Sequence, residues 1–320
     1  MQVGAFTCWL GDRPLADALD FLAALNIHAV EIGTGGYPGD THASAAELAH
    51  NTAKRAAFLQ AFDARGMTIS ALSCMGNPLH PQEAIAAQHR QQFRDSVVLA
   101  EQLGIPQVIT FAGCPGTPTE THYPNWVTTT FPEEFLELLE WQWRERVIPY
   151  WQDEMARCRA HGVRVAIELH PGTVTYNTAT FMRLRAAIGE DIGVAYDPSH
   201  LFWQQMDPIA VVRALGTAIF HVHAKDTVIN QHNTQRNGVV DVTPPDQPAQ
   251  RSWQFRTVGY GHDAQFWKAL VSALQEVGYD GALSIEAEDT LLSKREGLTR
   301  AAQLLHDAVS TEAPDAPWWT

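Results

Sequence analysis

The sequence predicts an α/β protein folded as a single (β/α)8 (TIM) barrel. Short apolar runs alternate with segments of helical spacing along all 320 residues, which is the pattern of a parallel sheet covered by helices. The last four runs also end in acidic or histidine side chains, as expected where barrel strands meet at one face. A doubly wound open sheet is the competing architecture. It is less well supported, because the segment after the first strand, TCWLGD, has no nucleotide-binding fingerprint.

The first half of the chain contains four predicted strand–helix units. Pro14 stands at a helix start, and Ser44 with Glu47 forms a capping-box pattern. Gly104 and Pro106 end the third helix. The predicted strands are residues 2–7, 28–33, 67–73 and 107–113, and the predicted helices are residues 14–26, 44–64, 81–103 and 132–160.

The second half repeats the rhythm with one interruption. The predicted strands are residues 164–169, 192–197, 219–226 and 282–288, and the predicted helices are residues 178–188, 207–216, 264–277 and 296–309. Residues 227–261 are polar and lack a helical period, so we expect a long loop after the seventh strand that covers the substrate as a lid. The barrel is predicted to span residues 1–310. The tail, residues 311–320, is expected to fray unless Trp318 and Trp319 dock.

Composition excludes several classes of function. The formal net charge is −14, which repels nucleic acid and anionic membrane surfaces. The sequence has no apolar run long enough to span a bilayer and no leader-like start, so a cytoplasmic location is predicted. The four cysteines include no C-x-x-C pair and are interpreted as buried apolar side chains.

The run IFHVHAKD, residues 219–226, carries the most informative pattern. It places His221, His223 and Lys225 at alternate positions, so all three point to one face of an extended strand. Three other strand-like runs also end in polar side chains. These are Glu168 in VAIELH, Asp197 and His200 in IGVAYDPSH, and Glu286 and Glu288 in LSIEAED.

A barrel would bring Glu168, Asp197, His223 and Glu286 to one face, from strands five to eight. Three carboxylates at this spacing repel one another unless a cation lies between them. We therefore predict a divalent metal site, with oxygen-rich ligation suited to Mn²⁺, Mg²⁺ or Co²⁺ and compatible with Zn²⁺. The alternative interpretation is a set of isolated polar caps at strand ends.

The runs AIELHPG, AYDPSHLFW, FHVHAKDT and LSIEAED, together with VEIG, GNPLHP and RTVGYGH, resemble the xylose isomerase-like barrel superfamily, in its sugar phosphate isomerase/epimerase branch. The resemblance implies a metal held by Glu168, Asp197, His223 and Glu286. It also implies proton exchange by the two glutamates and substrate-oxygen contacts from His200 and Arg256. The ketose epimerases of this superfamily carry a further Glu in the loop after strand five. This chain has His170, Pro171, Gly172 and Thr173 there instead.

Further candidates lie near the same face. His170 shares the strand face of Glu168, and Asn77 and His80 lie in the loop after strand three. Each is interpreted either as a substrate contact or as a loop hydrogen-bonding group. Lys225 could polarise a carbonyl as a catalytic group or form a salt bridge at the barrel rim. His221 is interpreted as a core histidine, and Glu31 and Glu288 as residues that orient ligands.

These observations predict a metal-dependent sugar isomerase or epimerase that transfers a proton at the carbon alpha to a carbonyl, through an enediolate. The substrate would be a small carbohydrate or a polyol-derived keto compound. A lyase or dehydratase using the same site is the first alternative. A phosphodiesterase of the endonuclease IV type and a sugar-binding protein without catalysis are the others. The sequence does not decide whether the protein forms a homo-oligomer. A group of aromatic residues either packs within the protein or forms a subunit contact: Trp141, Trp143, Tyr150 and Trp151.

Overall fold

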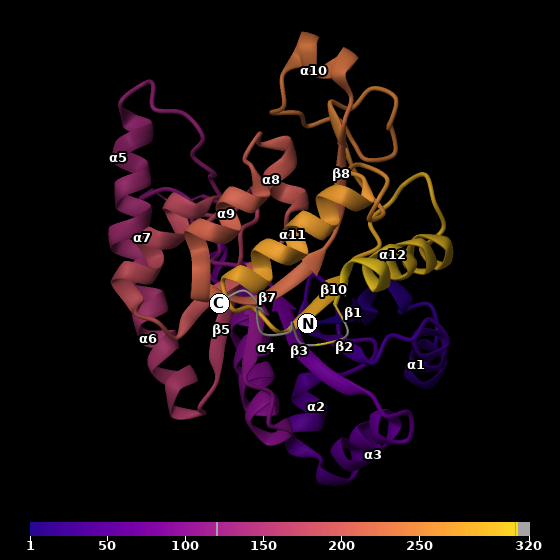
Figure 1. The fold of residues 1–320 in the computed structure, drawn as a ribbon. Coiled ribbons are helices and arrows are strands. Elements are labelled where there is room, and N and C mark those ends of the chain that lie inside the picture. The colour runs from indigo at the N-terminus through magenta and orange to yellow at the C-terminus, as the bar shows by residue number, and fades with distance from the viewer. Residues whose placement is uncertain (120, 311, 313–320) are drawn as a thin grey trace, which may run out of the picture.

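The computed structural model describes residues 1–119, 121–310 and 312, and within this range eight parallel strands close a barrel (Figure 1). Each barrel strand pairs with the next barrel strand along the chain, and the last barrel strand pairs with the first. The predicted fold class is confirmed. The barrel strands are β1 (Gln2–Phe6), β2 (Ala29–Gly36), β3 (Thr68–Met75), β4 (Gln107–Thr110), β5 (Arg164–Glu168), β6 (Ile192–Tyr196), β7 (Ile219–Ala224) and β10 (Ala282–Ile285).

Helices surround this barrel, and several begin at caps that the sequence supplies. Asp207 accepts hydrogen bonds from the first backbone N–H groups of α9, and Asn177 and Thr180 form a capping box at α7. The α-helices are α1 (Leu15–Ala24), α2 (Ala45–His50), α3 (Thr52–Asp63), α4 (Glu83–Leu103), α5 (Glu134–Trp141), α6 (Ile148–Ala160), α7 (Thr178–Ile188), α8 (Ser199–Trp203), α9 (Pro208–Leu215), α10 (Gln231–Asn237), α11 (Ala264–Glu276) and α12 (Lys294–Ala308).

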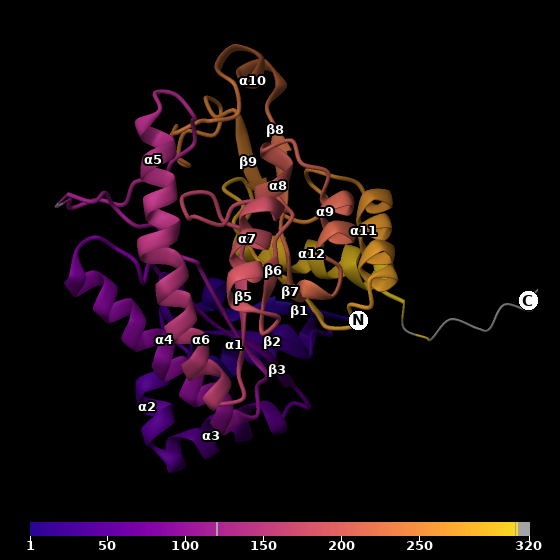
Figure 2. The ribbon, with the colours of Figure 1, turned by 90° about the vertical axis from the view of Figure 1, so that its left-hand side faces the viewer.

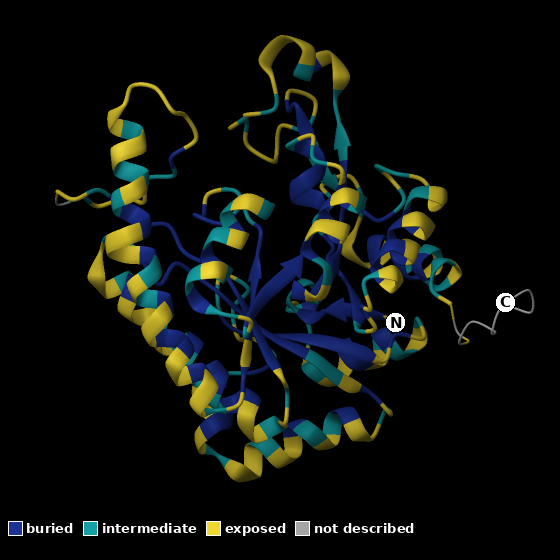
Figure 3. Cartoon of the chain, turned by 60° about the vertical axis from the view of Figure 1, so that its left-hand side comes forward, coloured by how far each residue is buried: buried dark blue, intermediate teal, exposed yellow. Residues whose placement is uncertain are grey.

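The strands alternate between two buried environments, which Figure 3 shows as dark blue segments inside a shell of partly exposed helices. Val30 and Ile32 face outward into the core that the helices cover. The residue between them, Glu31, therefore faces the barrel interior. A separate interior cluster contains Phe6, Ile109 and Ala166. Glu31 of β2 and His221 and His223 of β7 are buried polar residues, and they place charge beneath one end of the barrel.

Two predicted helices have interruptions. The predicted helix at 44–64 is wrong as a single element, because Asn51 is extended, with φ −125° and ψ 97°, and its side chain caps α3 at Lys54. The predicted helix at 132–160 is continuous (Figure 2), but a π-helical stretch, Gln142–Val147, joins α5 to α6. Pro149, two residues after this stretch, has no N–H to donate, which is consistent with the local shift in hydrogen bonding.

The predicted seventh strand at 219–226 is too long. β7 ends at Ala224, Lys225 lies between strands, and Asp226 begins β8 (Asp226–Ile229). The segment 227–261, predicted to lack regular structure, contains α10 and β9 (Trp253–Arg256), which pairs antiparallel with β8. This segment, here called the ribbon, projects beyond the barrel (Figure 1). The expectation missed it because its strands are short and its pairing is not local in sequence.

The Asp226 side chain anchors the ribbon. It is fully buried and accepts hydrogen bonds from the backbone N–H groups of Thr227, Gly259, Gly261 and His262. The ring Nδ1 of His262 lies 2.7 Å from the same carboxylate. One buried carboxylate therefore joins the start of the ribbon to its end.

No helix in the part of the chain that the structure describes is long and apolar enough to cross a membrane. The prediction for the tail at 311–320, with Trp318 and Trp319, falls on residues outside the described ones apart from residue 312.

Replacing Asp226 by Ala should destabilise the protein by about 3 kcal/mol, because several partly buried N–H groups would lose their acceptor. Urea unfolding of Asp226→Ala and the wild type measures this difference. Asp246→Ala, at an exposed position in the same segment, is the control and should match the wild type. Equal stability of all three proteins would contradict the anchoring role.

Asp289 gives a pH-dependent contribution to stability. Burial opposes its charge, but the N–H groups of Thr257 and Leu291 and the Arg256 guanidinium hold the pKa of Asp289 below its ordinary value. Because the folded-state pKa lies below the unfolded value of about 3.9, the contribution is complete above that value and is lost as pH falls through the folded-state pKa. The stability difference between wild type and Asp289→Asn should therefore shrink between about pH 6 and about pH 3. Unfolding curves at the two pH values measure it, and a difference that does not change with pH would refute this assignment.

Candidate metal centre and active site

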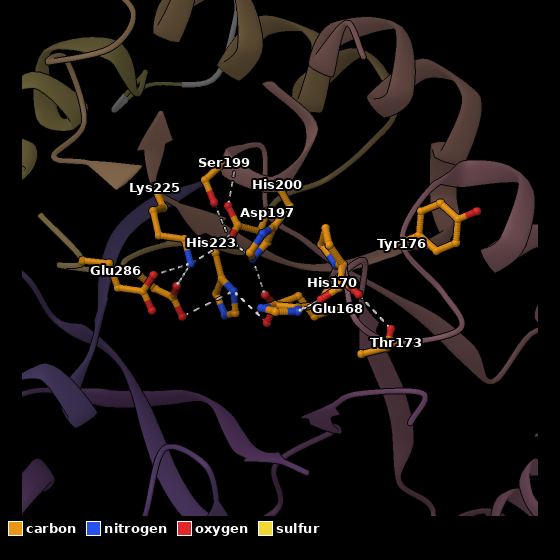
Figure 4. Close-up of polar contacts among 12 residues, drawn as sticks. Glu168, His170, Thr173, Tyr176, Asp197, Ser199, His200, His223, Lys225 and Glu286 are labelled. Carbon is orange, nitrogen blue, oxygen red and sulfur yellow. Dashed lines mark hydrogen bonds and ion pairs between the residues drawn. The ribbon is translucent and has the colours of Figure 1, made fainter. Parts of the chain in front are cut away.

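Four predicted ligands lie together at the carboxyl ends of β5, β6, β7 and β10 (Figure 4). One ligand atom each from Glu168, Asp197 and His223 lies within 4.8 Å of the others. The Nδ1 atom of His223 is 3.6 Å from Glu168 Oε2 and 3.6 Å from Glu286 Oε1. All four side chains are buried. The structure therefore brings together the set of residues that the strand ends predicted.

Lys225 supplies the positive charge within this group. Its Nζ atom lies 2.6 Å from Glu286 Oε2, 3.0 Å from Asp197 Oδ2 and 3.5 Å from Glu288 Oε2. Although burial opposes its charge, Asp197 and Glu286 hold the pKa of Lys225 well above its usual range. Against burial, Lys225 and His200 lower the pKa of Asp197 to about 2. Burial raises the pKa of Glu168 and of Glu286.

Glu31 lies beneath the ligands, and its carboxylate is shared by two histidines. The Nε2 atoms of His221 and His223 lie 2.9 Å and 3.1 Å from Glu31 Oε2 and Oε1. Ser73 and Ser284 each donate a further hydrogen bond to this carboxylate. Burial opposes the charge, but His223 and His221 hold the pKa of Glu31 well below its usual range. The interpretation of His221 as a core histidine agrees with this contact.

The residues present fit a divalent cation. Glu168 Oε2 and His223 Nδ1 are buried and have no hydrogen-bond partner among the described residues. Buried polar atoms are normally paired, so two unpaired atoms in one cluster indicate a missing partner. Carboxylate oxygens with one imidazole nitrogen form a common ligand set for divalent metals. Glu168, Asp197, His223 and Glu286 are therefore the residues able to hold the ion.

A cavity of about 510 Å³ opens beside these ligands. Its polar side is lined by Glu168, Glu286, Glu288, His170 and Lys225. Its other side is mainly aromatic and apolar, with Phe6, Trp9, Tyr37, Met75 and Phe111. This volume suits a small polar molecule. Another hollow, about 620 Å³, lies at the opposite end of the barrel around Met1 and Asp280, and its described lining residues include none of the predicted site residues.

Two histidines connect the ligands to the cavity. The Nε2 atom of His200 is 3.2 Å from Glu168 Oε1 and 3.3 Å from Asp197 Oδ2. The rings of His170 and His200 pack edge to face, with centroids 4.3 Å apart (Figure 4). Burial lowers the pKa of each to about 4. Both imidazoles are therefore neutral near pH 7.

Three predicted substrate contacts have other partners in the structure. Asn77 bonds the backbone of Leu79 and Cys114. His80 Nδ1 accepts a hydrogen bond from the Gln82 N–H. Arg256 pairs with Asp289, Nε to Oδ2 at 3.0 Å. Asn77, His80 and Arg256 do not appear among the described residues that line the 510 Å³ cavity, so their substrate-binding roles stay predictions.

Two contacts were not anticipated. Ser199 holds Asp197 through its backbone N–H and its hydroxyl, at 2.8 Å and 2.9 Å; the Asp-Pro-Ser spacing of an Asx turn was the available signal. Phe255 of the ribbon packs on His200, with centroids 5.2 Å apart, and its ring centroid lies 4.7 Å from Lys225 Nζ. Its signal was the alternation of Trp253 and Phe255 in a short strand. The ribbon therefore reaches the site through an aromatic side chain.

Comparison with curated proteins gives one relative over nearly the whole chain. The uncharacterized protein YfiH of Bacillus subtilis (strain 168) is 37% identical over 313 residues, which are 97% of this chain and 100% of that protein. The inosose dehydratase of Lacticaseibacillus casei is 27% identical over 133 residues, which are 41% of this chain and 43% of the enzyme.

Solved structures share the fold over 96% of this chain. The probable 3-DHS dehydratase AsbF from Bacillus anthracis matches with a TM-score of 0.67 at 15% identity over 99% of its chain. The IolI protein with a bound zinc atom matches with a TM-score of 0.63 at 17% identity, over 98% of its chain. D-psicose 3-epimerase from Clostridium cellulolyticum H10, with D-tagatose, matches with a TM-score of 0.60 at 14% identity, over 98% of its chain. The solved structures with this fold therefore include a probable dehydratase and an epimerase.

The family model described as "Xylose isomerase-like TIM barrel" matches residues 19–308. This match covers all the barrel strands except β1. With the closed barrel, it confirms the resemblance noted in the sequence: this chain belongs to the xylose isomerase-like TIM barrel family.

Proposed function

We propose that this protein is a divalent-metal-dependent sugar isomerase or epimerase that moves a proton at the carbon alpha to a carbonyl of a keto-sugar or keto-polyol. One observation carries the proposal: two buried glutamates, Glu168 and Glu286, both face His223 Nδ1 and both line the cavity. A proton taken by one carboxylate can be returned by another group on a different side of the substrate.

Glu168, Asp197, His223 and Glu286 would hold the ion. Mn²⁺, Mg²⁺ and Co²⁺ suit three carboxylates and one imidazole, and the zinc in IolI adds Zn²⁺. When bound, the ion supplies Lewis-acid polarisation of the substrate carbonyl, which acidifies the adjacent C–H bond.

The two glutamates have different surroundings. Glu168 Oε2 has no hydrogen-bond partner among the described residues, so this carboxylate is free to act as the base. Glu286 Oε2 accepts a hydrogen bond from Lys225, which can stabilise negative charge on the substrate oxygen. The aromatic side of the cavity, including Phe111 and Trp9, would exclude water from the reacting carbon.

A dehydratase is the second candidate, and a specific observation favours it. His170 lines the cavity and is neutral near pH 7. Its neutral ring can therefore accept a hydrogen bond from a substrate hydroxyl, while Glu168 takes the alpha proton and passes it to the departing hydroxyl, which leaves as water. The partial match to inosose dehydratase agrees with this chemistry.

Solvent-deuterium exchange by NMR tests the proposal. Protein loaded with Mn²⁺, with a chelated sample as control, is incubated in D₂O with a panel of keto-sugars and oxidised inositols, and the spectra are recorded after the metal is removed. Label should enter at one carbon only with metal present. Retention of the carbon skeleton and of every hydroxyl identifies the isomerase or epimerase, whereas loss of water identifies the dehydratase. Absence of both uptake and turnover across the panel would defeat the proposal.

Glutamine substitutions test whether Glu168 and Glu286 are the acid–base groups. Glu168→Gln and Glu286→Gln should each slow exchange by at least about 10²-fold, because each removes an acid–base group. The matched control is Glu276→Gln, an exposed glutamate paired with Arg213, which should exchange at the wild-type rate. Near-normal exchange in metal-loaded Glu168→Gln would rule out Glu168 as the base.

A further inference from the structure

Glu31 and His221 lie beside His223, one of the four candidate metal ligands. Together with His223 they offer another set of ligand atoms within 4.8 Å of one another. Glu31 is fully buried, as are both histidines. Its four partners lie on β3, β7 and β10, so three other strands converge on this one carboxylate.

Hydrogen bonding shows that this cluster is complete as it stands. Glu31 Oε1 accepts from Ser73 Oγ and faces His223 Nε2, and Oε2 accepts from Ser284 Oγ and faces His221 Nε2. A carboxylate has about four acceptor positions, and here each has a donor. The cluster is therefore a hydrogen-bonded support and not a second metal site.

The two ring nitrogens of His223 have opposite surroundings. Nε2 lies 3.1 Å from Glu31, at hydrogen-bond distance. Nδ1 lies 3.6 Å from Glu168 and from Glu286 and has no hydrogen-bond partner among the described residues. An acceptor below the ring requires a proton on Nε2, which leaves the Nδ1 lone pair available on the side of the carboxylates.

We propose that Glu31 is the positioning residue of the metal centre: its carboxylate keeps the proton on His223 Nε2 and directs the Nδ1 lone pair at the ion held with Glu168, Asp197 and Glu286. This inference rests on the metal site of the proposed function. Ser73, Ser284 and His221 hold the carboxylate in place from three sides. Glu31 is not among the described residues that line the cavity, so its proposed role is exerted through its contact with His223.

Zinc affinity tests the inference without any substrate. Competition with a chromogenic chelator gives the dissociation constant of the wild type, Glu31→Gln and Glu276→Gln. Glutamine keeps the shape of Glu31 but loses its charge and places an NH₂ group on one side, so Zn²⁺ binding should weaken by about 10- to 100-fold. Glu276→Gln makes the same chemical change at an exposed glutamate paired with Arg213, so its affinity should stay near the wild-type value.

NMR of ¹⁵N-histidine-labelled, Zn²⁺-loaded wild type gives a second readout that does not depend on a variant folding. His223 should coordinate zinc through Nδ1 and keep a slowly exchanging proton on Nε2. Coordination through Nε2 would overturn the inference, as would Zn²⁺ affinity in folded Glu31→Gln equal to that of the wild type. Failure of the wild type itself to bind Zn²⁺ or Mn²⁺ would instead overturn the proposed metal site, and this inference with it.

Discussion

The buried carboxylate of Glu31 is the constraint around which the carboxyl end of the barrel is arranged. Moving a carboxylate out of water costs several kcal/mol even after the protein relaxes, so it is retained in a core only when its acceptor positions are filled. Here β3, β7 and β10 each present a donor to it. The interior under β2 and β7 therefore cannot be packed with aliphatic side chains, as it is near Ile109. It becomes instead a polar support for His223.

Charge imbalance defines the layer above that support. Glu168, Asp197, Glu286 and Glu288 lie around one buried ammonium group, that of Lys225. One ammonium group cannot neutralise four carboxylates, and Glu168 Oε2 and His223 Nδ1 have no hydrogen-bond partner among the described residues. A divalent ion held among these side chains would reduce the repulsion and complete their coordination. The cavity beside them is lined by both charged and aromatic side chains.

The ribbon contacts the candidate site directly. Asp226 joins its two ends, Thr227 Oγ1 donates to the Ser199 carbonyl at 2.8 Å, and Phe255 packs on His200 and Lys225. Ser199 in turn holds Asp197. A chain of direct contacts therefore runs from the ribbon to a proposed metal ligand, so a change in the ribbon could alter the position of Asp197 without touching the cavity.

The sequence by itself determined the fold class and which side chains reach the carboxyl end of the barrel. Alternation along residues 219–226 assigns a face to His223, and the caps at Asp207 and Gly104 mark helix ends, because these signals depend only on neighbouring residues. The tertiary structure decided the partners. Asn77 bonds the Cys114 backbone, Arg256 pairs with Asp289, and Glu31 gathers donors from three other strands. A polar group's hydrogen-bond partner depends on which distant segments the fold brings within about 3 Å of it. The local spacing of residues does not determine those distances.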